Sequence, residues 1–334
     1  MTTTRDSGPM WAVEIASFGG PEVLRPVTRS IPQPAAGELL IRVHAAGVAR
    51  ADTMQRQGKY PPPAGASDIP GLDVAGTIAS PDPSGRFQIG DRVCAILTGG
   101  GYAEYCVAPV EQVLPTPAGW EDAEAATLPE NIFTAFDNLI TRPALVKGET
   151  VLIHGGTSGV GSMAIMLGRA WDATVIATAG SSRKCEDCRL LGANFAIDYR
   201  AQDFVAEVKA LTGGNGANVV LDMVGGSYLD RNLQVLATEG RLSLIATQGG
   251  SKSELDLGTL MRKRARVMGS TMRTRTAAQK GEVAARLFEE VWPLLPGKSV
   301  IRPLIDSTFP LRHAAEAHAR MESGEHIGKI VLLA

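Results

Sequence analysis

The chain has 334 residues, and its 33 lysine and arginine residues nearly balance its 35 aspartate and glutamate residues. This length predicts two domains, each with a core of its own. The net charge of −2 gives no electrostatic attraction for nucleic acid or for an anionic membrane. No apolar run is long enough to span a membrane, and residues 1–10 lack the apolar core of a secretory signal. We therefore expect a cytoplasmic protein.

The first part of the chain carries short strand-like runs separated by turns rich in proline and glycine. The runs are residues 10–15, 38–45, 74–78 and 92–96. This pattern is typical of a compact, mainly antiparallel or barrel-like domain. The pattern becomes helical after Pro115, which predicts a domain boundary near Pro129.

The most informative motif is HGGTSGVG at residues 154–161, which follows the apolar run 151–153. A helical pattern continues to Ala170, so the motif predicts a strand, a tight glycine turn and a helix N-terminus. Such a turn lets the backbone approach a dinucleotide pyrophosphate, which the helix dipole also attracts. Ser158 stands where the G-x-G-x-x-G pattern has its middle glycine, so the motif alone also fits an ordinary glycine-rich turn.

The segments that follow decide between these interpretations. Residues 173–178, 195–198, 217–224 and 241–247 are apolar runs typical of buried parallel strands. Residues 182–191 and 203–211 are predicted helices between them. The glycine turn thus follows the first strand of a doubly wound parallel sheet, which is the context that nucleotide binding requires.

The end of the second strand indicates which dinucleotide is bound. NAD enzymes usually place a carboxylate there to hold the ribose 2′-hydroxyl. Residues 177–184 contain no carboxylate, whereas Ser181, Arg183 and Lys184 would attract the 2′-phosphate of NADP. Arg183 and Lys184 could instead simply solvate an exposed helix start. We interpret the cofactor as NADP(H).

The four cysteines predict no disulfide framework. Cys185 and Cys188 have C-x-x-C spacing, but no second pair completes a four-ligand metal site. Both fall inside a predicted helix, and we interpret them as ordinary helix residues. The basic run at residues 262–266 is interpreted as a solvated helix end rather than a nucleic-acid patch.

Several longer segments resemble a known family. The segment RADTMQRQGKYPPP strongly resembles the quinone oxidoreductases of the medium-chain dehydrogenase/reductase superfamily. The branch that it resembles contains the tumour-suppressor-inducible NADPH quinone oxidoreductases. The resemblance extends from Met10 to the C-terminus. Its matching segments are residues 50–63, 100–105, 128–130, 134–136, 221–226 and 327–332.

The resemblance implies an α/β protein in which a Rossmann doubly wound parallel sheet is joined to a GroES-like, mainly β catalytic domain. The implied domains are residues 1–129 for the first part of the catalytic domain and 130–272 for the NADP-binding domain. Residues 273–334 return to the catalytic domain, and a cofactor cleft is expected between the two domains.

Zinc-dependent members of the superfamily have a Gly-His-Glu motif, where this chain has Leu72 in place of the histidine. The four-cysteine zinc loop is also absent, and the five histidines are scattered without ligand spacing. We therefore expect that the protein binds no metal. Its chemistry would then depend on NADPH as the hydride carrier.

The resemblance also implies the site residues. Tyr60 and Thr134 would border the nicotinamide and the substrate, although Tyr60 would also fit as a core or rim aromatic. Lys329 would reach the cofactor or form a surface salt bridge, and Tyr199 would serve the ribose phosphate or simply end a strand. The other implied cofactor contacts are Ser158, Gly159 and Val160 at the pyrophosphate; Gly180, Ser181 and Lys184 with Tyr199; Val224 and Gly225 at the adenosine ribose; and Ile245, Ala246, Thr247, Gly269, Ser270, Thr271 and Arg273 on the nicotinamide side.

One position departs from the family. Relatives usually have asparagine where this chain has Ala49. The lost side-chain hydrogen bond would typically cost about 0.5–1.5 kcal/mol of interaction free energy and would loosen the orientation of the substrate. We predict a homodimeric, zinc-independent NADPH:quinone oxidoreductase that takes a quinone or another planar electrophile. An NADPH-dependent reductase of enones or enoyl thioesters is the first alternative. A non-catalytic NADPH-binding regulatory protein is the second.

Overall fold

We describe a computed structural model of the chain, which covers residues 8–296 and 301–334. The chain forms two compact units. Within the described residues, the β unit consists of residues 8–130, 272–296 and 303–334, and the α/β unit consists of residues 131–271 and 301–302. Within the covered residues, no helix is both long enough and apolar enough to cross a membrane.

The α/β unit is built on a sheet of six parallel strands in the order β10-β9-β8-β11-β12-β13. Strand β8 is buried throughout its apolar part, as expected for a strand covered on both faces. The strands are β8 (Thr150–Ile153), β9 (Thr174–Ala179), β10 (Phe195–Asp198), β11 (Ala217–Asp222), β12 (Leu236–Leu244) and β13 (Arg266–Gly269).

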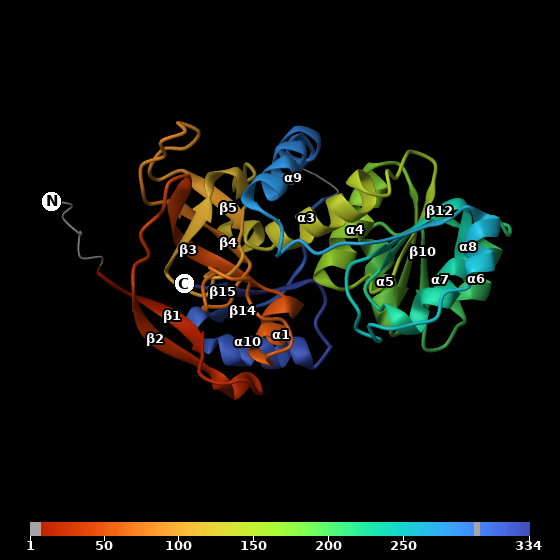
Figure 1. Ribbon diagram of the computed structural model, residues 1–334, viewed down its shortest axis with the longest axis horizontal. Coiled ribbons are helices and arrows are strands. Elements are labelled where there is room, and N and C mark those ends of the chain that lie inside the picture. The colour runs from red at the N-terminus through yellow and green to blue at the C-terminus, as the bar shows by residue number, and fades with distance from the viewer. Residues whose placement is uncertain (1–7, 297–300) are drawn as a thin grey trace. The chain divides into compact units, whose positions relative to one another are not determined.

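Helices cover both faces of this sheet. Figure 1 shows α4 (Gly159–Ala170) and α5 (Ser182–Leu190) on one side, and α6 (Phe204–Leu211), α7 (Leu229–Val235) and α8 (Leu257–Lys263) on the other. The strand order reverses between β8 and β11, so the turns after these two strands flank a switch point, where α/β sheets bind ligands. The predicted doubly wound sheet is confirmed.

The bounds of β11 and β12 differ most from the prediction, and strand β13 was not predicted. Strand β11 stops at Asp222 rather than at residue 224, because the Asp222 carboxylate accepts hydrogen bonds from the N–H groups of the next residues and closes a turn. Strand β12 begins at Leu236 instead of residue 241, since Leu236 already pairs with Ala217 before the irregularity at Glu239, whose φ is +63°.

The β unit contains a seven-stranded sheet in which β14-β15-β3-β4-β5-β7 form one path and β6 pairs with β3. Strands β1 and β2 form a separate antiparallel pair. A core of buried aliphatic side chains lies between the strands and includes Leu39, Ile41 and Val74. The strands are β1 (Pro9–Ile15), β2 (Leu24–Ser30), β3 (Glu38–Val48), β4 (Asp73–Ile78), β5 (Arg92–Ile96), β6 (Tyr105–Pro109), β7 (Val113–Pro115), β14 (Ile305–Pro310) and β15 (Lys329–Leu333).

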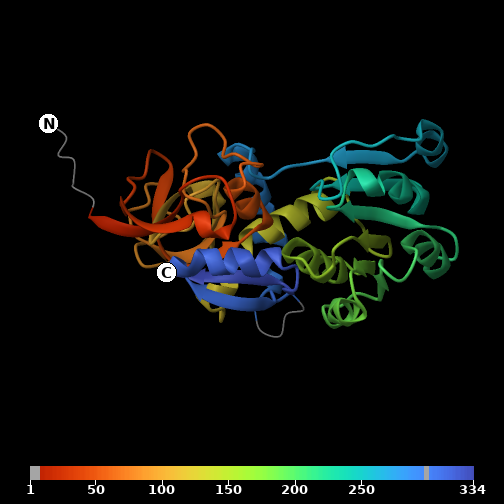
Figure 2. The ribbon, with the colours of Figure 1, turned by 90° about the horizontal axis from the view of Figure 1, so that it is seen from below.

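The end of the chain completes the sheet that began near its start. Strand β15 pairs antiparallel with β3, and β14 pairs parallel with β15. Figure 2 shows α10 (Ala314–Glu322) running along these two strands, against which it packs. The remaining α-helices are α1 (Arg50–Arg56), α2 (Asp122–Ala125), α3 (Pro129–Phe136), which continues as a π-helix over Asp137–Thr141, and α9 (Ala277–Glu290). Short 3-10 helices cover Pro21–Val23, Val110–Gln112, Gly226–Tyr228, Trp292–Leu294 and Leu311–His313.

Candidate active site

The turn after β8 is shaped by two glycines. Gly155 has a left-handed backbone with a φ of +67°. A Cβ added at Gly161 would lie only 2.1 Å from the carbonyl oxygen of Gly155, so a side chain there would force the turn apart. Ser158 has a φ of −72°, which any residue adopts. The serine that weakens the sequence motif is therefore compatible with the turn.

Ser158 also starts helix α4. Its Oγ accepts a hydrogen bond from the Gly161 N–H at 3.0 Å, and its hydroxyl donates to Met223 Sδ at 3.5 Å. With Ser158 as the N-cap, the N–H groups of Gly159 and Val160 lie in the first turn, where the helix itself offers no acceptor. Such N–H groups, together with the helix dipole, favour an anion. The geometry therefore fits a pyrophosphate.

Polar side chains surround the tip of β9. Ser181 is the N-cap of α5, and its Oγ accepts a hydrogen bond from the Lys184 N–H at 3.2 Å. A Cβ added at Gly180 would lie 2.9 Å from Tyr199 Oη and 3.4 Å from Arg200 Nε. The structure therefore brings Gly180 and Ser181 together with the end of β10. Tyr199 and Arg200 are both exposed, so they are accessible to a ligand.

The turns after β11 and β12 lie against each other. Gly225 has a φ of +83°, and a Cβ there would lie 2.9 Å from Thr247 Cα and 3.2 Å from the Ala246 carbonyl oxygen. The Gly249 N–H donates to the Val224 carbonyl at 2.6 Å, which fastens the two turns. Four of the predicted residues, Val224, Gly225, Ala246 and Thr247, thus form one surface, with Ile245 directly before them.

Asn138, in the π-helix that follows α3, joins three segments of the predicted nicotinamide side. Its Nδ2 donates to the Thr134 carbonyl at 2.9 Å, and its Oδ1 accepts from Ser243 Oγ at 2.7 Å and from Ser270 Oγ at 2.9 Å. Asn138 and Ser243 are buried, whereas Thr134 and Ser270 are partly exposed. Thr134 and the segment Gly269, Ser270 and Thr271 are therefore held relative to each other through one amide.

In the β unit, Arg273 holds Tyr60. The Arg273 guanidinium lies 5.3 Å from the centre of the Tyr60 ring, and its Nη1 donates to the Tyr60 carbonyl at 3.3 Å. Its other donors go to the Thr98 carbonyl at 2.9 Å and to Gln55 Oε1 at 2.5 Å. Burial raises the pKa of Tyr60, and the nearby Arg273 opposes that rise. Tyr60 therefore keeps its proton at neutral pH and can donate it.

Lys280 lies in the same cluster. Its Nζ donates to Thr98 Oγ1 at 2.9 Å, and the side chain is almost completely buried. Burial lowers the pKa of Lys280 to about 8, and Arg273 and Arg275 act in the same direction. Positive charge thus accumulates around the segment that carries Tyr60.

Lys329 is held by carboxylates. Its Nζ lies 2.6 Å from Asp73 Oδ2 and 3.7 Å from Glu130 Oε2, and its side chain is 4% exposed. It forms a buried ion pair, in contrast to the surface salt bridge that the sequence left open. Asp52, also buried, accepts from the Ala49 N–H at 2.8 Å and the Gly71 N–H at 3.1 Å. Asp52 thereby fixes the backbone at Ala49, the position that departs from the family.

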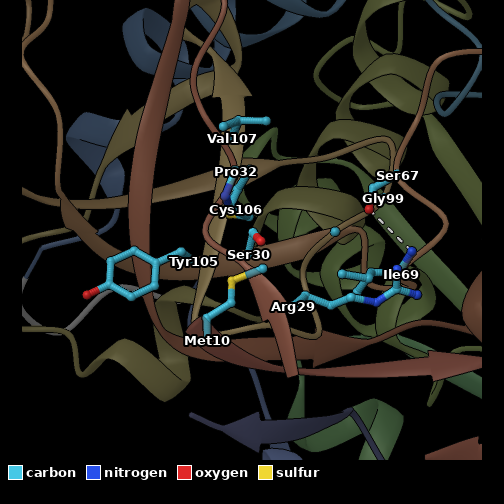
Figure 3. Close-up of a pocket in the computed structure, with 11 residues that line it drawn as sticks. Met10, Arg29, Ser30, Pro32, Ser67, Ile69, Gly99, Tyr105, Cys106 and Val107 are labelled. Carbon is cyan, nitrogen blue, oxygen red and sulfur yellow. Dashed lines mark hydrogen bonds between the residues drawn. The ribbon is translucent and has the colours of Figure 1, made fainter. Parts of the chain in front are cut away.

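A cavity of about 400 Å³ opens elsewhere in the β unit. Figure 3 shows Met10, Tyr105 and Cys106 on its wall, with Ser67 Oγ accepting from the Ile69 N–H at 3.2 Å. The predicted site residues do not line this cavity. The cavity therefore does not include Tyr60 or Thr134, the two residues that the resemblance places beside the substrate.

Sequence reasoning missed several residues around these turns. Arg200 directly follows Tyr199, and this neighbouring cation was a usable signal. Asn131 packs so closely on the phosphate turn that a Cβ at Gly159 would lie 2.7 Å from its Oδ1. Neither Asn131 nor Asn138 has a local sequence pattern that marks it, because each acts through contacts with distant segments.

Two family models match the chain. One, described as an alcohol dehydrogenase GroES-like domain, matches residues 35–118 in the β unit. The other, described as a zinc-binding dehydrogenase, matches residues 159–290, which include most of the α/β unit. The predicted combination of a GroES-like domain with a Rossmann-type sheet is confirmed.

Full-length relatives agree with the two family models. The human quinone oxidoreductase is 32% identical over 333 residues, which is 97% of this chain and 98% of that protein. A mycobacterial protein solved with NADPH has a TM-score of 0.85 and 32% identity, and covers 97% of this chain and 100% of its own. The Escherichia coli quinone oxidoreductase, also solved with NADPH, has a TM-score of 0.83 and 28% identity at the same two coverages.

The fold and the glycine turn define an NAD(P)-dependent oxidoreductase built from a GroES-like and a Rossmann-type domain. The chain belongs to the medium-chain dehydrogenase/reductase superfamily and is quinone oxidoreductase-like within it.

The residues present do not fit a zinc site. In the covered ranges, no three His, Cys, Asp or Glu side chains group so that they could hold a metal ion. Leu72 is buried and offers no ligand atom. Cys185 and Cys188 lie in α5 as predicted, where burial raises the pKa of the Cys188 thiol to about 12 and so disfavours the thiolate that a metal needs.

Proposed function

We propose that this chain is a zinc-independent oxidoreductase that reduces quinones with NADPH. The observation that carries the cofactor choice is the tip of β9, where Tyr199 Oη and Arg200 Nε lie beside Gly180. Ser181 and Lys184 begin the next helix at the same tip. Residues 177–184 contain no carboxylate, and these cations and hydroxyls suit a 2′-phosphate, which the ribose of NADH lacks.

The remaining cofactor contacts follow from the turns. The N–H groups of Gly159 and Val160 would hold the pyrophosphate, and Val224 and Gly225 would flank the adenosine ribose. When bound, NADPH supplies the hydride. The protein orients the reacting groups and excludes competing reactions, with Thr134 and Ser270 held on the nicotinamide side by Asn138.

The quinone as substrate is supported by the similarity of the chain to the human and Escherichia coli quinone oxidoreductases. Quinones accept hydride with little acid catalysis beyond solvent protons, so few polar groups are needed at the substrate. Tyr60 and Thr134 would border it. Residues 50–63 support the tumour-suppressor-inducible branch of the family, in which Tyr60 belongs to the most specific segment.

One observation favours reduction of enones or enoyl thioesters as the second candidate. Such a reaction needs a proton donor at the substrate, and Tyr60 carries a hydroxyl on a ring that the Arg273 guanidinium faces at 5.3 Å. The Tyr60 phenol is protonated at neutral pH, and burial raises its pKa above the ordinary value. The same side chain would donate the proton that an alkene requires after hydride transfer.

A homodimer is proposed from the open edge of the α/β sheet. Among the described residues, strand β13 pairs with β12 alone, and Val267 is exposed on it. Leu257 and Met261 on α8 are also exposed, at 61% and 75%. An exposed edge strand with neighbouring apolar side chains is suited to pairing with a second copy.

The test is steady-state and stopped-flow oxidation of NADPH with ortho- and para-quinones, run in parallel with NADH and with an enone. We expect quinone turnover with a strong preference for NADPH, and weaker NADPH binding in Lys184→Ala. Lys209→Ala, an exposed lysine on α6, is the matched control and should behave like the wild type.

Enone turnover without quinone turnover would replace the proposal with the second candidate. Tight NADPH binding with no turnover of either electrophile would indicate a regulatory protein. Equal use of NADH and NADPH would remove the role given to Lys184.

A further inference from the structure

A network of hydrogen-bonded, buried polar side chains lies next to the predicted cofactor-binding turns of the α/β unit. His154 Nδ1 lies 3.0 Å from Thr178 Oγ1, and His154 Nε2 lies 2.8 Å from Asn232 Oδ1. Asn232 Nδ2 donates to Asp222 Oδ2 at 3.0 Å. All four side chains are at most 1% exposed. Their hydrogen-bond partners are therefore supplied by the protein.

The partners of Asp222 determine where the protons lie. Its carboxylate accepts from the Val224 N–H at 2.6 Å, the Gly225 N–H at 3.1 Å and the Asn232 amide. Because the Asn232 amide donates through Nδ2, its Oδ1 is an acceptor and His154 Nε2 must carry a proton. In a neutral ring Nδ1 is then an acceptor, and the Thr178 hydroxyl donates to it.

His154 is held in this neutral form. Burial lowers its pKa to about 4, and Arg231 acts in the same direction. The rings of Phe204 and Tyr228 meet the imidazole edge-on at centroid distances of 4.9 and 5.0 Å. The ring can therefore neither charge at neutral pH nor rotate away from its two partners without displacing packed aromatics.

Each end of this hydrogen-bond network belongs to a segment that the proposed function assigns to cofactor binding. His154 directly precedes the glycine turn after β8, and Thr178 precedes the β9 tip at Gly180. Asp222 closes the turn that contains Val224 and Gly225. The network thus connects the ends of three strands, β8, β9 and β11, around the switch point between β8 and β11.

We propose that His154 is a positioning residue for the dinucleotide: as the neutral Nε2–H tautomer, it holds the turns after β8, β9 and β11 in the spacing that NADPH requires. This inference rests on the proposed NADPH binding. A site held in its bound geometry before the ligand arrives loses less entropy on binding. Disrupting this hydrogen-bond network should therefore weaken cofactor binding while the hydride-transfer rate of the bound complex stays unchanged.

The two halves of this hydrogen-bond network can be disrupted by separate substitutions. Thr178→Val removes the donor to Nδ1 at nearly constant volume and frees the β9 tip, where the 2′-phosphate would bind. Asn232→Leu removes the link to Asp222 and frees the turn at the adenosine ribose. His154→Gln retains an N–H donor for Asn232 but loses Thr178. Asn218→Leu is the matched control, because Asn218 Oδ1 accepts from the Thr150 N–H at the other end of β8.

We would titrate NADPH and NADH into each full-length variant by nucleotide fluorescence, and measure kcat and unfolding in urea beside each titration. Losing one buried hydrogen bond should raise the Kd for NADPH by roughly threefold to tenfold. Thr178→Val and His154→Gln should lose preference for NADPH over NADH, whereas Asn232→Leu should weaken both nucleotides equally. Asn218→Leu should lose stability without a change in either Kd.

Imidazole ¹⁵N spectra of the wild type test the proton positions independently of binding. We expect two of the five histidines, His154 and His318, to remain neutral Nε2–H tautomers from pH 5 to pH 8, and one of these two signals to disappear from the spectrum in His154→Gln. Unchanged Kd values in Thr178→Val and His154→Gln would overturn the proposal, as would an Nδ1–H tautomer at His154. A wild type that binds NADPH but reduces no quinone would overturn the proposed activity alone, since the readout here is nucleotide binding.

Discussion

Lys329 Nζ lies 2.6 Å from Asp73 Oδ2, and both side chains are buried inside the β unit. Asp73 Oδ1 also accepts from the Glu130 N–H at 2.5 Å, at the start of α3. The last strand of the chain, strand β4 and helix α3 therefore meet at one carboxylate. Removing one partner of such a buried ion pair is strongly destabilising, because the other charge then stays buried without a partner.

Breaking this pair should strongly destabilise the protein. Asp73→Asn leaves Lys329 with Glu130 alone, and Lys329→Met leaves buried carboxylates without their cation. Each should lower the free energy of unfolding by about 3–5 kcal/mol in urea titrations. Lys147→Met is the control, because Lys147 and its partner Asp172 are 81% and 65% exposed and should contribute less than about 1 kcal/mol. Equal losses at the two sites would contradict the prediction.

His318 should make stability depend on pH. It is buried, Tyr102 Oη lies 3.0 Å from its Nε2, and burial together with Arg56 lowers its pKa to about 3. The unfolded chain takes up this proton near pH 6.5 and the folded chain does not, so unfolding becomes easier as the pH falls below 6.5. This histidine should cost about 1.4 kcal/mol per pH unit.

The comparison is between the wild type and His318→Gln at pH 6.5 and pH 5, by urea unfolding. The stability advantage of the wild type should shrink by about 2 kcal/mol over this interval. Asp52 acts in the opposite sense, since burial raises its pKa to about 6, but it is present in both proteins. The exposed His313 provides the control substitution, His313→Gln. A difference that does not change with pH would show that His318 is charged in the folded protein.

Arg200 should select NADPH over NADH. Its Nε lies beside Gly180 and the Tyr199 hydroxyl at the β9 tip. Arg200→Ala should raise the KM for NADPH by roughly tenfold or more, the typical cost of a hydrogen bond to a charged group. The KM for NADH should stay nearly constant. Arg200→Lys should recover part of the loss, because it restores the charge but not the guanidinium geometry. Equal effects on both nucleotides would contradict this role.

Gly161→Ala should damage the phosphate turn. The new Cβ would lie 2.1 Å from the Gly155 carbonyl oxygen, so either the turn or the start of α4 must move. We expect NADPH binding to fall below detection in fluorescence titration and the melting temperature to drop. Gly8→Ala adds the same atom where nothing lies within 4 Å, and should leave both quantities unchanged. Normal NADPH affinity in Gly161→Ala would rule out this turn as the pyrophosphate site.

Tyr60→Phe should separate the two candidate reactions. It removes the hydroxyl and keeps the ring that lies 5.3 Å from the Arg273 guanidinium. Quinone reduction should stay within about threefold of the wild type, because solvent can supply its protons. Turnover of an enone, if the wild type shows any, should fall by roughly 10²-fold or more, the usual contribution of a general acid. A large loss of quinone turnover would show that Tyr60 does more than border the substrate.

Several strands of the α/β unit could be predicted to within a residue or two, whereas β12 starts five residues before the predicted run 241–247 and β13 was not predicted. The run 195–198 coincides with β10, and the strand β9 is offset by one residue from the predicted run 173–178. Apolar runs of this length between glycine-ended helices leave little choice, since both faces of a parallel sheet must be covered. The end of β11 could not be predicted, because it depends on hydrogen bonds that the Asp222 side chain makes to its own turn.

Part of the candidate site was also accessible from the sequence. The glycine turn, the absence of a carboxylate after β9 and the cation at Lys184 each depend on residues close together in the chain. Asn138 was not accessible, because it bonds Ser243 and Ser270, which lie 105 and 132 residues further along. The buried state of Lys329 was missed for the same reason, since its partner Asp73 is 256 residues away.

The sequence by itself determined the alternation of strands and helices, the glycine turn and its charge environment, because periodicity, turn residues and local charge act over a few residues. Tertiary structure alone decided which polar groups are buried together. Arg200 comes to Gly180, and His154 to Thr178 and Asn232, only when the parallel strands align and their ends meet at one edge of the sheet. Burial then removes water as a partner, and the protonation and position of each group depend on neighbours far along the chain.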